Sequence, residues 1–281
     1  MQMSVRTVLV ISRPRFWLYL AGPFILAYAL GAPNSGQFFT LQFWLYFMFF
    51  LVPANIFLYG INDLADTDTD QFNSRKDGYE HALQSTQKRP LILVLIGCVA
   101  ITFATALITA NFIAGLLLFS LLGLSFAYSF PPFRWKSKPF IDSASNILYV
   151  IPGIFGYYVL AGSLPSSLAI FAFGFWTAAM HLFSAIPDIE ADSRSGLRTT
   201  AVVLGERRSL LLCSALWFFS MVGVFILTSS LYSLLLSMYV IAPLLCLQKG
   251  WSAAKLYPVF PFLNAGIGFI AFWIIVILRL L

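Results

Sequence analysis

Long apolar runs, separated by short polar segments, occupy most of the chain. Nine of these runs come close to the roughly 20 residues that an α-helix needs to cross the hydrocarbon core of a bilayer. Because a helix satisfies its own backbone hydrogen bonds, unbroken runs of this length indicate helices. The runs are residues 16–32, 38–61, 91–110, 112–130, 141–162, 167–187, 209–228, 230–248 and 260–280. The pattern predicts an all-α polytopic membrane protein with nine transmembrane helices, in which residues 1–281 form a single domain.

The composition agrees with this class. The chain is 60% hydrophobic and 10% charged, whereas soluble domains are usually about 45–50% apolar and about 25% charged. The net charge of +6 does not indicate nucleic-acid binding, because the basic residues form no solvated face or arm. Cys98, Cys213 and Cys246 lie singly inside apolar runs, so we expect them to be buried as small hydrophobic side chains.

The charged residues predict the topology. If the N-terminus is cytoplasmic, one face of the membrane receives the N-terminal tail and residues 62–90, 131–142, 188–208 and 249–259. These segments hold all 11 acidic residues and 16 of the 17 basic ones, and Arg279 is the exception. The positive-inside rule places this face in the cytoplasm. We therefore expect a protein of the cytoplasmic (cell) membrane, with the C-terminus on the opposite side and the chemistry at the cytoplasmic face.

Two acidic clusters stand at this face, and the first is "NDLADTDTD", which begins at Asn62. In a helix that continues past the second apolar run, Asp63, Asp66 and Asp70 lie at i, i+3 and i+7, within about 60° of one another. The polar residues Asn55 and Tyr59 precede them and extend a stripe into the membrane. The first cluster therefore predicts a face of carboxylates.

The second cluster is the i, i+4 pair Asp188 and Asp192, which also ends a polar stripe. Carboxylate oxygens suit Mg²⁺, a hard cation that is commonly shared with substrate phosphates. A solvated helix end is the structural alternative for each cluster. A calcium-binding loop at "DTDTDQFNSRKD" is disfavoured, because Gln71 replaces the usual glycine and Asp77 the usual glutamate.

Basic residues at the same face could bind a diphosphate. Any one of them could instead follow from the positive-inside rule, but together with two acidic clusters they suit a polyphosphate. Pro131 and Pro132 end the fourth run and redirect the chain, so that the following basic residues can bend back. The candidate diphosphate-binding residues are Arg13, Arg15, Asn62, Lys76, Arg134, Lys136 and Arg198.

Three residues are candidates for direct catalytic roles. Tyr128 precedes the two prolines and could stabilise a carbocation through its ring face. Asp142 begins the fifth run, where it could serve either the site or the helix N-terminus. His181 lies on the stripe that leads to Asp188, and it could be a base or a hydrogen-bonded intramembrane histidine.

At these motifs the chain resembles the UbiA superfamily of intramembrane prenyltransferases. The family pattern N-D-x-x-D-x-x-x-D is present from Asn62 to Asp70, and D-x-x-x-D is present at Asp188 and Asp192, followed by "SRSGLRTTAVVLG". The resemblance implies a nine-helix bundle with a cytoplasmic-facing active site, in which both motifs bind Mg²⁺ and a prenyl diphosphate. It also implies a lateral cavity open to lipid.

A narrower resemblance concerns the acceptor. "YSFPPFRWKSKPFIDSASNILYVIPG" and "HLFSAIPDIEADSRSGLRTTA" are similar to the lycopene elongase branch, whose members prenylate acyclic carotenoids. In the aromatic-acid branch a basic residue follows the tyrosine closely, whereas here two prolines separate Tyr128 from Arg134. The expected reaction is transfer of a dimethylallyl group to lycopene, and an aromatic or quinone-precursor acceptor is the alternative.

Proteins of other classes fit less well. A transporter would more often carry ionisable groups near the middle of the membrane, and a membrane phosphotransferase would carry D-G-x-x-A-R, which is absent. We therefore expect the partners to be a prenyl diphosphate, a lipophilic acceptor and membrane lipid, with no nucleic acid. The sequence leaves the oligomeric state open.

Overall fold

The computed structural model describes residues 3–66, 83–248 and 251–281, and in these ranges it contains helices and no strand. Seven helices are long and apolar enough to cross a membrane, which confirms the predicted class. They are Leu41–Ala65, Lys88–Thr109, Phe112–Ser129, Ile141–Ala161, Ser167–Arg194, Thr200–Thr228 and Ala253–Leu280. The two other predicted spans form shorter helices, Leu18–Gly31 and Leu231–Cys246. The count of nine transmembrane helices therefore stays a prediction.

The chain divides into two compact units. The first unit comprises Met1–Phe133, Ile151–Leu164 and Gly268–Leu281, and the second comprises Arg134–Val150 and Pro165–Ile267. The predicted single domain likewise stays a prediction.

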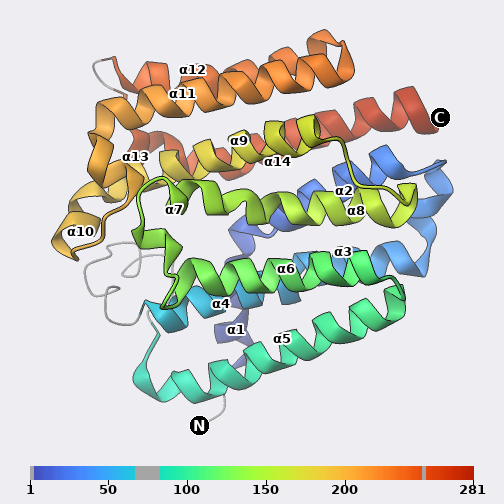
Figure 1. The fold of residues 1–281 in the computed structure, drawn as a ribbon, viewed down its shortest axis with the longest axis horizontal. Helices are drawn as coiled ribbons and strands as arrows, with labels where there is room; N and C mark the ends of the chain where they lie inside the picture. Colours follow the sequence, from blue (N-terminus) through green and yellow to red (C-terminus); the bar gives the residue numbers. More distant parts are fainter. Residues whose placement is uncertain (1–2, 67–82, 249–250) are drawn as a thin grey trace. The chain divides into compact units, whose positions relative to one another are not determined.

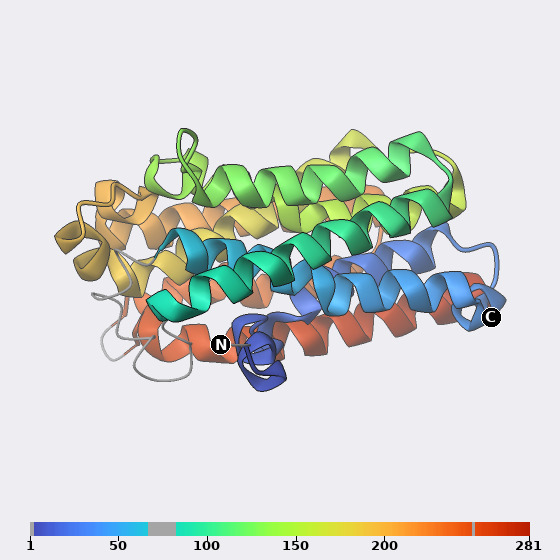
Figure 2. The ribbon, with the colours of Figure 1, turned by 90° about the horizontal axis from the view of Figure 1, so that it is seen from below.

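The first unit is built around long helices that run back and forth. Its helices are α1 (Val5–Ile11), α2 (Leu18–Gly31), α3 (Leu41–Leu51), α4 (Pro53–Ala65), α5 (Lys88–Thr109), α6 (Phe112–Ser129) and α8 (Ile151–Ala161). Helices α5 and α6 form an antiparallel hairpin, in which Ala110 takes a left-handed conformation (φ 50°) and the Asn111 side chain caps α6. The two helices meet at this turn and diverge away from it (Figures 1 and 2).

The predicted second span is broken in the middle. Because Pro53 has no N–H and crowds the residue before it, α3 ends at Leu51 and α4 begins at Pro53. The completely buried Asn55 side chain donates hydrogen bonds to the carbonyl oxygens of Phe50 (2.8 Å) and Leu51 (3.0 Å). Asn55 thus has a structural role at the break, in place of the site stripe expected from its spacing.

Close contact between α2 and α8 holds another part of the first unit together. A Cβ atom added to Gly156 of α8 would lie 2.7 Å from the Phe24 carbonyl oxygen and 3.2 Å from the Tyr28 nitrogen of α2. The ring of Phe24 packs against Phe155 and Phe50, at centroid separations of 6.5 and 5.2 Å. A residue without a side chain at position 156 is therefore what lets these backbones approach.

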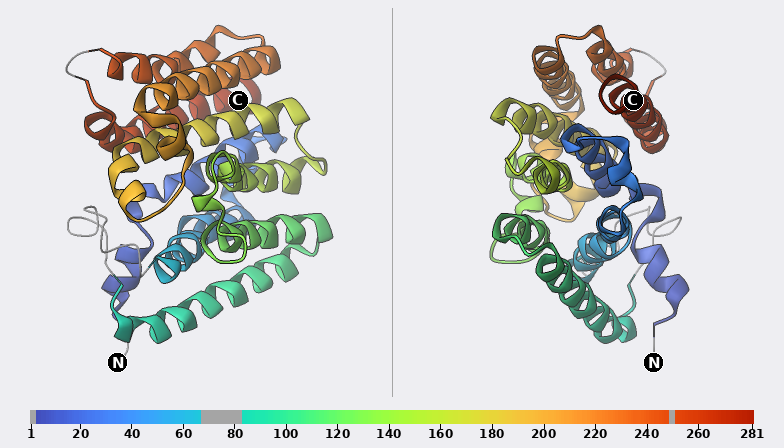
Figure 3. Two further views of the ribbon diagram at one scale, coloured as in Figure 1. Left: turned by 60° about the vertical axis from the view of Figure 1, so that its left-hand side comes forward. Right: turned by 90° about the vertical axis from the view of Figure 1, so that its right-hand side faces the viewer.

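The second unit carries the second acidic cluster. Its helices are α7 (Ile141–Ala144), α9 (Ser167–Ala185), α10 (Ile189–Arg194), α11 (Thr200–Thr228), α12 (Ser237–Cys246), α13 (Ala253–Leu256) and the first part of α14 (Phe260–Ile275). Helices α9 and α11 pack side by side (Figures 1 and 3). Helix α11 is interrupted at Gly205, whose φ of 71° is left-handed. The predicted run 209–228 lies within α11, which begins earlier, at Thr200.

We predict that Gly156→Ala lowers the stability of the protein. The added methyl group must push the Phe24 and Tyr28 backbone apart, and overpacking of this kind typically costs about 1–3 kcal/mol. Gly22→Ala in α2 is the matched control, because nothing lies within 4 Å of a Cβ atom at that position. Thermal unfolding in detergent should show a lower midpoint for Gly156→Ala only, and equal midpoints for the two variants would contradict the packing argument.

Candidate functional site

Asp63 of the first acidic cluster is buried and paired with a cation. It is 1% exposed, and Arg13 Nη2 donates to its Oδ1 at 3.0 Å. The Arg13 guanidinium also lies over the Tyr59 ring, 4.8 Å from the centroid. A buried carboxylate costs free energy unless a charge or hydrogen bonds compensate it. The Arg13 guanidinium therefore offsets the negative charge of the buried Asp63 side chain near the C-terminal end of α4.

The chain before α2 is shaped to deliver this guanidinium. Helix α1 ends at Ile11, and the buried Ser12 hydroxyl donates to the Leu9 carbonyl (2.7 Å) and accepts from Trp17 Nε1 (3.0 Å). Arg13 follows with a φ of 51°, a conformation that is uncommon for residues other than glycine. The Ser12 hydrogen bonds and the ion pair hold Arg13 in this strained position. Sequence reasoning placed Arg13 at the site but missed its partner.

The rest of the first motif lies around the end of α4. The Asn62 side chain donates to Ser129 Oγ of α6 at 3.4 Å. Helix α4 continues past its predicted end at residue 61 to Ala65, and the N–H of the half-buried Asp66 still bonds to the Asn62 carbonyl. Tyr128 is half-buried one residue before Ser129. Asp70 and Lys76 fall outside the described residues.

In the second unit, Asp142 links two helix ends. It is completely buried. Its carboxylate accepts the N–H groups of Ser143 and Thr200, each at 2.7 Å, as well as the Thr200 hydroxyl. Three donors thus surround a carboxylate in the first turn of α7 and fasten it to the first residue of α11. These bonds favour a structural role for Asp142 at the helix N-terminus. A catalytic role for Asp142 stays a prediction.

The same end of α11 also reaches the second acidic motif. Thr199 caps α11, and its hydroxyl donates to Asp192 Oδ2 at 3.4 Å. Asp188 stands at the N-terminal cap of α10, and Asp192 lies within that helix, so both remain on one short helical segment. Sequence reasoning missed both threonines, although they follow the motif directly in "GLRTTA".

The other predicted site residues of the second unit are spread over three elements. His181 is half-buried in α9, and the Ser184 hydroxyl donates to its carbonyl oxygen at 2.7 Å. Arg198 is exposed in the turn before α11. Lys136 is buried in the short 3₁₀ helix Trp135–Ser137, and Arg134 precedes it. Arg134 Nε and Nη2 are buried without a hydrogen-bond partner in the described part of the chain.

Within each unit, the structure brings some of the predicted residues together. Arg13 meets Asp63 in the first unit, while Asp188 and Asp192 share a helix in the second. The approach of the two acidic motifs to each other stays a prediction. Residues 3–66, 83–248 and 251–281 contain no group of three or more His, Cys, Asp or Glu side chains that could hold a metal ion by themselves. Mg²⁺ does not require one, since it usually binds one or two carboxylates together with water and phosphate oxygens.

We predict that Asp142→Asn and Thr200→Val both lower the unfolding midpoint. In Asp142→Asn, the N–H₂ group of the new amide would face donors that now bind the carboxylate. A buried donor left without an acceptor costs about 1–3 kcal/mol of stability. Thr228→Val is the control at the other end of α11, where the exposed threonine hydroxyl donates to the Val224 carbonyl and accepts only from the N–H of nearby Ser230. An Asp142→Asn protein that is inactive but unfolds like the wild type would instead support a catalytic role.

Known proteins resemble the chain in sequence and in fold. A profile of the UbiA prenyltransferase family matches residues 17–273. Lycopene elongase/hydratase of Haloferax volcanii is 40% identical over 92% of this chain and 85% of its own length. The protein of the same name from Halobacterium salinarum is 38% identical over 94% of this chain and 95% of its own.

The fold comparison agrees. A UbiA homologue from Archaeoglobus fulgidus, solved bound to DMAPP and Mg²⁺, superposes with a TM-score of 0.72 at 24% identity, covering 95% of this chain and 99% of that one. The expected resemblance to the superfamily, and to its lycopene elongase branch, is confirmed. This multi-pass membrane protein belongs to the UbiA prenyltransferase family and is a prenyltransferase.

Proposed function

We propose that the enzyme transfers a dimethylallyl group from dimethylallyl diphosphate to the end of an acyclic carotenoid, with lycopene as the acceptor. The observation that carries this proposal is the match to the lycopene elongase/hydratases, which extends over 92% of the chain at 40% identity. The DMAPP named for the Archaeoglobus fulgidus homologue supports the choice of donor. The altered spacing between Tyr128 and Arg134 supports a polyene over an aromatic acid.

We further propose that the aspartates of both motifs are magnesium ligands. The ligand residues are Asp63, Asp66, Asp70, Asp188 and Asp192. Their oxygen donors match the preference of Mg²⁺, and Asp66, Asp188 and Asp192 are only partly buried. When bound, Mg²⁺ would offset the negative charge that develops on the departing diphosphate.

The basic residues would bind the diphosphate oxygens directly. Arg134 supports this role, because two of its guanidinium nitrogens are buried without a partner among the described residues. Donors of this kind match phosphate geometry and lose free energy if they stay unpaired. We assign the same role to Arg15, Asn62, Lys76, Lys136 and Arg198. We assign two roles to Arg13. It pairs with the Asp63 carboxylate, and it would also bind the diphosphate beside the aspartates of the first motif.

The reaction would proceed through an allylic cation. The bond between carbon and the bridging oxygen breaks, and its electron pair leaves with the diphosphate. The terminal double bond of the acceptor then supplies the electrons for the new carbon–carbon bond. The resulting tertiary cation either loses a proton or captures water. We assign the ring of Tyr128 to cation stabilisation. We assign the acceptance of the proton to His181 and not to Asp142, the other candidate, because three hydrogen bonds already surround the Asp142 carboxylate.

The proposed setting is the cell membrane, with a cytoplasmic N-terminus and a C-terminus on the other side. The 27 charged residues assigned to one face, 11 acidic and 16 basic, support this orientation. It would place both motifs where a soluble diphosphate can reach them.

We predict that Asp63→Asn and Asp188→Asn each lower turnover by about 100-fold or more, because each change removes a charged ligand of the Mg²⁺ that would offset the charge developing on the departing diphosphate. Asparagine retains the shape of the side chain, which limits damage to the fold. Glu190→Gln is the control. Glu190 lies two residues after Asp188, but its side chain is exposed and pairs with Arg194. Turnover is measured with radiolabelled dimethylallyl diphosphate. Near-normal turnover by folded Asp63→Asn and Asp188→Asn proteins would remove the carboxylate assignment.

We also predict the products. Membranes containing the protein, supplied with dimethylallyl diphosphate and lycopene, should yield carotenoids heavier by one or two five-carbon units, with or without added water. Mass spectrometry of the extracted pigments detects them. Unchanged lycopene, together with prenylation of a hydroxybenzoate or naphthoate by the same membranes, would establish the aromatic alternative.

A further inference from the structure

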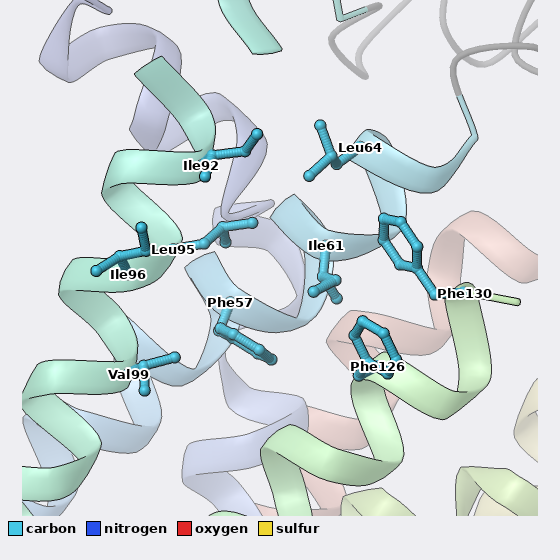
Figure 4. A pocket seen from close by; sticks show the side chains of 9 residues that line it. All are labelled: Phe57, Ile61, Leu64, Ile92, Leu95, Ile96, Val99, Phe126 and Phe130. Atoms are coloured by element: carbon cyan, nitrogen blue, oxygen red, sulfur yellow. The ribbon is translucent and has the colours of Figure 1, made fainter. Parts of the chain in front are cut away.

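An apolar cleft in the first unit has no place in the proposed reaction. It has a volume of about 320 Å³ and is lined by nine described side chains from α4, α5, α6 and Phe130 directly after α6, all of them apolar (Figure 4). The buried Ile61 of α4 lies between Ile96 of α5 and Phe126 of α6 in the view of Figure 4. Ile96 and Phe126 are 58% and 42% exposed, so the cleft opens to the surroundings of the protein.

The cleft follows from the way the three helices meet. The α5–α6 hairpin is closed at Ala110 and Asn111 and diverges away from this turn, while α4 contacts both helices. Gly60 allows α4 to approach α5, because a Cβ atom there would lie 3.0 Å from the Leu95 side chain. The divergence leaves a wedge at the end where α4 and α6 finish and α5 begins, and no side chain of the described residues fills it.

The cleft is separate from the carboxylate site. Phe57, Ile61 and Leu64 form one face of α4, and Asp63 points about 120° away from that face, towards Arg13. The hydrogen bond from Asn62 to Ser129 ties α4 to α6 beside the cleft. A molecule in the cleft is therefore held apart from the reacting diphosphate.

The lining and its surroundings indicate the occupant. Water needs polar partners to occupy a cavity, and the described residues of the lining offer none, so a hydrocarbon chain is the fitting occupant. Arg89 is exposed on the first turn of α5, three residues before Ile92 and seven before Ile96. It lies within about 60° of both on the helix surface. A basic residue at the end of a membrane helix attracts anionic lipid headgroups. A polyene acceptor has no anionic group that could pair with Arg89.

We propose that this cleft binds one acyl chain of an anionic phospholipid, whose phosphate is held at Arg89. The acyl chain packs against α4, the helix that carries Asn62 and Asp63, and fills the space between α5 and α6. It stabilises the first unit without entering the reaction. The proposal is independent of the donor and acceptor assigned above.

The test uses the purified full chain in detergent with added phosphatidylglycerol or phosphatidylcholine of the same acyl chains. Thermal unfolding and native mass spectrometry report the stabilisation and the number of retained lipids. We expect a saturable upward shift of the midpoint that is larger with phosphatidylglycerol. Arg89→Gln should weaken the apparent affinity for phosphatidylglycerol about fivefold and remove the preference. Ile96→Trp, which fills the cleft, should abolish the binding of both lipids.

Two matched controls should behave like the wild type. Gly97→Trp adds the same side chain to α5 about 150° from the cleft face, where a Cβ atom meets nothing within 4 Å. Arg207→Gln removes another exposed basic residue, in the second unit. An unchanged lipid preference in Arg89→Gln, or unchanged binding in Ile96→Trp, overturns the proposal. Displacement of the retained lipid by lycopene also overturns it and makes the cleft an acceptor site.

Discussion

The ion pair between Arg13 and Asp63 is the interaction on which the candidate site of the first unit depends. A carboxylate at 1% exposure costs free energy unless a cation or hydrogen bonds compensate it, and at Asp63 the compensating group is the Arg13 guanidinium. The left-handed Arg13, the Ser12 hydrogen bonds and the proline that follows all serve to bring the guanidinium to this place. The pair also fastens the N-terminal segment to α4.

The second unit compensates a buried aspartate in another way. Asp142 is surrounded by backbone and hydroxyl donors from its own helix and from the start of α11. These donors are part of the fold and cannot move to a ligand without breaking it. Arg13 is a flexible side chain, and a second cation could share Asp63 with it. This difference explains why we assign Asp63 to the chemistry and Asp142 to the architecture.

Hydropathy alone predicts the helical class well, because a bilayer permits few other solutions. The runs 91–110 and 112–130 correspond to α5 and α6 within a few residues. The helix break has a signal in the sequence, Pro53 itself, but this proline lies inside the long apolar run 38–61 that predicts one continuous span. The bond between Asp142 and Thr200 joins residues 58 positions apart, and no local pattern predicts such a partner. Both motifs can be found from residue spacing, whereas their partners require the fold.

The central claim is that the two aspartate motifs hold a divalent cation that binds the prenyl diphosphate. Its most direct test is diffraction from crystals grown with Mn²⁺ in place of Mg²⁺ and with the unreactive thiolo analogue of dimethylallyl diphosphate. The account predicts anomalous peaks about 2.1 Å from carboxylate oxygens of Asp63 and Asp188, with the diphosphate bound to the same ions. Diphosphate and manganese located elsewhere, with both carboxylates bound only to protein groups, would contradict it.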